Sequence, residues 1–136
     1  MTALQKNAWY NLGVIAMTLS TIGVLIPLAG KGALGGFGFL GLLGLGPMFF
    51  RKRSGQVVLD ERDQSIANLS WNFAFAIFWV VAVMFAALVS ASVYGSDGAV
   101  PVWIVQSSVF VGLIVIYAMS SIAILVQYGR GAADGQ

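Results

Sequence analysis

Long uncharged stretches, separated by short segments that hold nearly all of the charge, dominate the pattern of this chain. Residues 7–30, 32–50, 64–96 and 98–129 contain no Asp, Glu, Lys or Arg, and they hold 24, 19, 33 and 32 residues. A membrane-spanning helix needs about 20 mostly apolar residues, so each stretch is long enough, the second only just. The pattern predicts an all-α integral membrane four-helix bundle, a single domain over residues 1–136, with spans at about 8–29, 33–50, 67–94 and 101–128 and a charged connector at 51–66.

Composition narrows the range of functions. The chain is 59% hydrophobic and only 9% charged, whereas ordinary soluble domains carry about 25% charged residues. It has no cysteine and no histidine, which excludes disulfides, thiolate metal sites and histidine-based acid-base chemistry. A formal charge of +2 is too small to indicate nucleic-acid binding. We therefore expect the lipid bilayer as a partner, and no nucleic acid, cofactor, metal ion or enzymatic activity.

The positive charges predict the orientation in the membrane. Six of the seven Lys and Arg residues lie before the first span, in the connector or after the last span, and only Lys31 lies elsewhere. Positive residues favour the cytoplasmic side, so four crossings place both termini and the connector on the cytoplasmic side of the cell (inner) membrane. The first apolar stretch is longer than the 7–15-residue core of a signal peptide, so we expect it to be retained as a helix.

The third predicted helix is longer than one crossing requires. From residue 60 to 94, at about 1.5 Å per residue, it would reach roughly 50 Å, against a hydrocarbon core of about 30 Å. Its first part is amphipathic, so we expect the excess to extend into the cytoplasm. Asp60 is suited to an N-cap, with Glu61 and Asp63 in the first turn. The polar ridge consists of Asp60, Gln64, Asn68 and Asn72, and the apolar face of Ile66, Leu69 and Phe73.

Small residues recur at spacings that allow helices to pack closely. The second stretch, GALGGFGFLGLLGLG before Pro47, is the richest in glycine. At about 100° per residue its glycines are spread around an α-helix and form no single seam. Two interpretations stay open, namely tight packing against several neighbours and a broken helix at a transporter's substrate site. The predicted packing positions are Gly13, Ala16, Ser20, Gly23, Gly32, Gly36, Ala82, Ala86, Ser90, Ser108 and Gly112.

A short motif at the end of the connector resembles a known family. Basic residues after the second span are followed by Gln56-Val57-Val58-Leu59-Asp60-Glu61-Arg62-Asp63 and then by Ile66. This pattern resembles the small prokaryotic membrane proteins catalogued as domain of unknown function 2178. Their D-E-R-x-x-x-I signature lies on the cytoplasmic side, just before a hydrophobic helix. The resemblance implies a membrane protein, and it implies no activity.

The charged connector admits few chemical roles. Its carboxylates could offer oxygen ligands to a divalent cation, but Arg62 lies among them and the spacing of an EF-hand is absent. A hydrolase would need a nucleophile with an activating base, and the serines have no histidine partner. Two interpretations remain, helix capping with interfacial anchoring, or docking of a cytoplasmic protein or a second copy. The docking or anchoring residues would be Arg51, Lys52, Arg53, Asp60, Glu61, Arg62, Asp63, Gln64 and Asn68.

The predicted function is that of an accessory, regulatory or scaffold component of the membrane. Ion-coupled transporters keep ionisable groups at mid-membrane, and the predicted spans contain no Asp, Glu, Lys or Arg. Four short spans enclose little volume, so we expect a homo-oligomer formed through small-residue faces. The alternative is a subunit of an oligomeric passive channel or small-solute transporter with a glycine-rich second helix.

Overall fold

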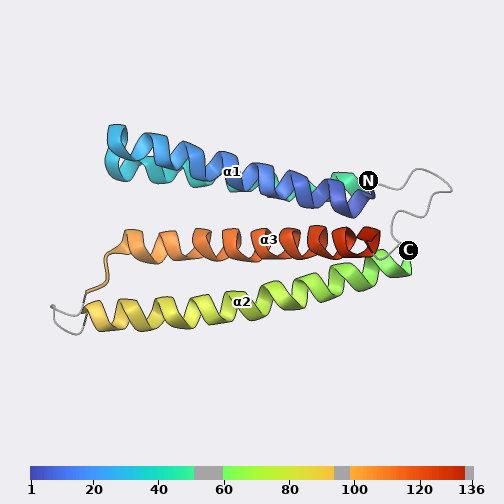
Figure 1. The fold of residues 1–136 in the computed structure, drawn as a ribbon. Coiled ribbons are helices and arrows are strands. Elements are labelled where there is room, and N and C mark those ends of the chain that lie inside the picture. Colours follow the sequence, from blue (N-terminus) through green and yellow to red (C-terminus); the bar gives the residue numbers. More distant parts are fainter. Residues whose placement is uncertain (51–59, 94–98, 134–136) are drawn as a thin grey trace.

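All regular secondary structure in the described part of the chain is helical. The computed structural model describes residues 1–50, 60–93 and 99–133, and these ranges contain no strand. The elements are the α-helix α1 (Ala3–Ala29), the 3-10 helix η1 (Gly30–Phe50) and the α-helices α2 (Glu61–Val93) and α3 (Val102–Ala133), as Figure 1 shows. The prediction of an all-helical protein is confirmed.

Local sequence determines where α1 begins and ends. Thr2 and Gln5 form a capping box, in which Gln5 N donates to Thr2 Oγ1 at 3.2 Å and Thr2 N donates to Gln5 Oε1 at 2.9 Å. This reciprocal pair satisfies amides that the first turn of a helix leaves free. At the other end Pro27 lies in the last turn, and Gly30 has φ +52°. A positive φ suits glycine, and here it marks the point where the chain turns back on itself.

η1 is an unusually long 3-10 helix, and its sequence repeats every three residues. Such helices make three residues per turn and rarely exceed three or four residues, but η1 has 21. From residue 32 the sequence reads GAL-GGF-GFL-GLL-GLG, with a glycine at the start of every triplet. At 120° per residue each position of the triplet forms its own face. The glycine row, Gly32, Gly35, Gly38, Gly41 and Gly44, is exposed, while Phe37, Leu40, Leu43 and Gly46 are buried.

The 3-10 geometry also explains how the short second stretch matches the first in length. With a rise of about 2.0 Å per residue, the 21 residues of η1 extend about 42 Å. The 27 residues of α1, at about 1.5 Å each, extend about 40 Å. η1 runs back along α1 (Figure 1), and the Tyr10 hydroxyl of α1 donates to the Leu42 carbonyl at 2.8 Å.

The helices have the length and composition of membrane segments. Three helical stretches of the described residues are long and apolar enough to cross a membrane, Ala3–Gly46, Glu61–Ala91 and Val102–Arg130. The first of them comprises α1 and most of η1, which lie side by side in opposite directions. Large apolar side chains are widely exposed, as with Leu28 at 79% and Leu88 at 68%. Such surfaces suit contact with lipid.

The helices form two antiparallel pairs that meet through α1 and α3. α1 packs on η1 and α3, and α2 packs chiefly on α3, which lies in the middle of the arrangement in Figure 1. One apolar cluster joins α1 and η1 and is covered by α3; Phe37 of η1 stacks on Phe110 of α3 with ring centroids 4.8 Å apart. A second cluster, at the end where both termini lie, joins Leu4, Ala8, Ile66 and Ile124.

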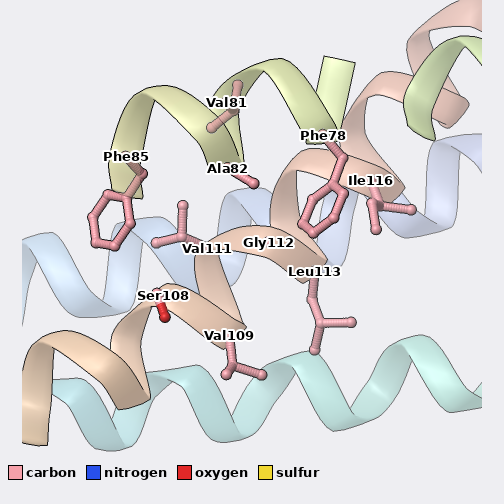
Figure 2. Close-up of a pocket in the computed structure, with 10 residues that line it drawn as sticks. All are labelled: Phe78, Val81, Ala82, Phe85, Ser108, Val109, Val111, Gly112, Leu113 and Ile116. Atoms are coloured by element: carbon pink, nitrogen blue, oxygen red, sulfur yellow. The ribbon is translucent and has the colours of Figure 1, made fainter. Parts of the chain in front are cut away.

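Where burial is described for α2, the fully buried residues all lie in its first half. Its buried residues are Asp63, Ile66, Ser70 and Ala74, at the three- and four-residue spacings of one helix face. Farther along, α2 and α3 leave an apolar groove of about 460 Å³ (Figure 2). Three predicted packing residues, Ala82, Ser108 and Gly112, line this groove. A Cβ added to Gly112 would lie 3.0 Å from Phe78 Cε2, so the two helices do approach closely here.

Candidate functional site

The described part of the charged connector lies at the start of α2, and Asp60 has the capping role that the sequence predicted. Asp63 N donates to the Asp60 carboxylate at 2.7 Å, and Gln64 N donates to the Asp60 carbonyl at 3.0 Å. The side chain therefore satisfies one of the amides that the first turn leaves free. Glu61 and Asp63 place two further acidic groups in this turn, where the helix dipole favours negative charge.

Asp63 points into the protein. Its side chain is only 7% exposed, and the Tyr128 hydroxyl of α3 donates to Asp63 Oδ1. A buried carboxylate needs such a hydrogen bond because burial removes its hydration. This hydrogen bond connects the start of α2 to the end of α3. Asp63 is thus a packing residue, unlike the surface residues with which the sequence analysis grouped it.

Ile66 of the motif is buried as well, but the charged and polar residues around it face outward. Glu61, Arg62, Gln64 and Asn68 are exposed, as is Asn72 farther along the polar ridge. Among the described residues neither Glu61 nor Arg62 forms an ion pair. Within the part of the chain that the structure describes, Arg62 therefore has no carboxylate partner. Asp60, Asp63 and Ile66 thus contribute to the fold through capping or burial, whereas Glu61 and Arg62 lie at the surface.

Hydrogen bonds between helices continue inward from the motif. Gln127 Nε2 of α3 donates to Ser70 Oγ of α2 at 2.9 Å, and Asn11 Nδ2 of α1 donates to Ser121 Oγ of α3 at 3.4 Å. Polar groups in membrane helices characteristically bond across helix interfaces in this way. The sequence analysis did not single out Asn11, Gln127 or the pairing of Tyr128. An isolated polar residue on an apolar stretch was the available signal for Asn11 and Gln127.

Some of the predicted packing residues lie at contacts between helices, and others lie at the surface. A Cβ added to Gly36 would lie 2.7 Å from Ile22 Cγ1, so Gly36 allows η1 to approach α1, and Gly32 lies beside Ala29. By contrast, Gly13, Ala16, Ser20 and Gly23 of α1 are exposed, as are Ala86 and Ser90 of α2. Within the described chain these residues lie at the surface, so their role in helix packing stays a prediction. The basic residues Arg51, Lys52 and Arg53 lie outside the described residues.

These features define a helical integral membrane protein, with apolar exposed surfaces and polar contacts between its helices. The chain belongs to the family described as "Predicted membrane protein (DUF2178)", whose model matches residues 5–127. The match extends the resemblance seen in the D-E-R motif to nearly the whole chain. No curated protein and no solved structure matches this chain.

Proposed function

We propose that the protein is an accessory or scaffold component of the prokaryotic cell membrane. Its docking face, defined as Glu61, Arg62, Gln64 and Asn68, would bind a cytoplasmic partner protein or a second copy of the chain. The division of the motif carries this proposal, because Asp60 and Asp63 are occupied in the fold while the docking face is exposed. A rigid helix that displays both signs of charge can select a partner by electrostatic complementarity.

The proposed topology supports this role. With four crossings, the positive charges place both termini and the start of α2 in the cytoplasm. In the structure these three points lie at the same end of the molecule (Figure 1). The proposal includes self-association, for which the exposed row Gly13, Ala16, Ser20 and Gly23 and the glycine row of η1 offer faces that a neighbouring helix can approach closely.

Photo-crosslinking in cells tests the docking face. A photoreactive amino acid replaces Ser65, which is exposed between the docking residues. We expect a discrete crosslinked product that is lost when Glu61 and Arg62 are both changed to alanine, with the melting temperature of the purified chain unchanged. Arg130→Ala, which removes an exposed charge at the end of α3, is the matched control and should keep the product. If the double variant leaves both the crosslink and the stability unchanged, the docking face is wrong.

A further inference from the structure

A cavity with a polar wall lies among all four helical elements, near the end of the molecule that holds both termini. Its volume is about 360 Å³, which is within the size range of small-molecule sites. It differs from the apolar groove of Figure 2, whose one hydroxyl, Ser108 Oγ, donates to the Val105 carbonyl at 2.6 Å. The residues that define the new cavity's chemistry are Asn7, Asn11, Trp71, Tyr117 and Ser120.

Two side-chain oxygens at this cavity have no hydrogen-bond donor in the described part of the chain. Asn7 Oδ1 and Asn11 Oδ1 are buried, and no described group donates to either. Asn11 is only 5% exposed, and its Nδ2 is directed to Ser121 Oγ. Gly46 of η1 makes room for Asn7, because a Cβ at that position would lie 3.0 Å from Asn7 Oδ1. Buried acceptors of this kind normally have a partner.

The lining specifies the chemistry of a partner. The asparagine oxygens accept hydrogen bonds, and Ser120 Oγ is already directed to the Tyr117 carbonyl at 3.2 Å. Apart from the Tyr117 phenol, no lining residue is ionisable, so a full charge would lose its hydration here without a counter-charge. Trp71 and Tyr117 pack edge to face with centroids 5.7 Å apart and form an aromatic wall. The site suits a neutral donor group attached to a short apolar body.

We propose that this cavity binds a small, uncharged amphiphile with an N–H or O–H donor, such as a primary amide. The donor group lies between the oxygens of Asn7 and Asn11, and the apolar part lies against Trp71. This site is separate from the docking face, and its existence does not depend on the proposed partner.

Fluorine NMR of the full chain labelled with 5-fluorotryptophan tests the site. The chain has four tryptophans; Trp71 lines the cavity, while Trp79 on the same helix is 64% exposed. Trp79 therefore controls for probes that only enter the detergent micelle. The probes are hexanamide, methyl hexanoate, which has a similar apolar chain but no donor, and hexylammonium. We expect hexanamide to shift the Trp71 signal saturably, and methyl hexanoate to bind about tenfold more weakly.

Variants assign the effect to the asparagine oxygens. Asn11→Leu should weaken hexanamide binding about tenfold and abolish the preference over methyl hexanoate, while Asn68→Leu, on the exposed docking face, should change neither. Gly46→Ala presses on Asn7 Oδ1 and gives a second test if Asn11→Leu does not fold. If every probe shifts the Trp71 signal no more than the Trp79 signal, the cavity holds water only, and the proposal is overturned. Preferential binding of hexylammonium would contradict the proposal that the ligand is uncharged.

Discussion

At the scale of single residues, some glycines of η1 are required for close packing within the chain, and others are not. A methyl group at Gly36 would lie 2.7 Å from Ile22 Cγ1 and 3.6 Å from the Ile22 backbone nitrogen, whereas nothing lies within 4 Å at Gly41. We expect Gly36→Ala to lower the stability of the folded chain by about 1–3 kcal/mol, the usual cost of overpacking. Gly41→Ala is the control and should change stability by less than about 1 kcal/mol. Unfolding by SDS titration, followed by circular dichroism, measures both; equal stabilities would contradict the close packing of η1 on α1.

Asp60 and Asp63 show which residue roles the sequence could predict. The cap at Asp60 depends on neighbours within one turn, so the pattern of acidic residues before an apolar stretch was sufficient to predict it. The burial of Asp63 depends on Tyr128, which is 65 positions away. Only the antiparallel packing of α2 on α3 brings the two together, and no local pattern contains that register. The same reason applies to Gln127 with Ser70, and to Asn11 with Ser121.

At the scale of elements, η1 is the main difference between the predicted and observed helices. The sequence analysis used about 100° per residue and found the glycines scattered. At about 120° five of these glycines, one from each triplet, align in one exposed row. Most of the residues two places after them are buried. The period of three was visible in the triplets that begin at Gly32, but α-helices are so much commoner than long 3-10 helices that their period was assumed.

Insertions into η1 distinguish the two helical periods. Three residues, Gly-Phe-Leu, inserted after Leu40 turn a 3-10 helix through a full circle and keep its faces, whereas four residues turn it by about a further 120°. In an α-helix the four-residue insertion would preserve the faces better. We expect the chain with three extra residues to retain more of its folded yield and melting temperature in detergent than the chain with four. The opposite order would show that this segment is an α-helix in the membrane.

At the scale of the whole molecule, the class of the protein followed from its sequence because burial in lipid requires long uncharged helices. The match of the family model over residues 5–127 agrees with that class. The arrangement of the helices was harder to predict from the sequence, because apolar residues occur on every face of a membrane helix and do not identify the face that points inward. The contacts of α3 with both α1 and α2 and the polar cavity depend on which faces meet. The number of crossings and the orientation stay predictions.

The exposed glycine row has its own consequence for how whole molecules associate. A Cβ added to Gly41 would meet no described side chain or neighbouring helix within 4 Å, yet a row of glycines on a membrane helix allows a second helix to approach its backbone. We expect Gly41→Leu to leave the fold unchanged and to lower the mass of the detergent-solubilised protein from an oligomer to a monomer. Light scattering after gel filtration, at several protein concentrations, measures this mass. Val83→Leu on α2, where an exposed apolar side chain is already present, is the matched control and should remain oligomeric. A wild-type chain that is monomeric at every concentration would contradict self-association altogether. If the oligomer is unaffected by Gly41→Leu, the contact between copies lies on another face, such as that of Gly13 and Ser20 on α1.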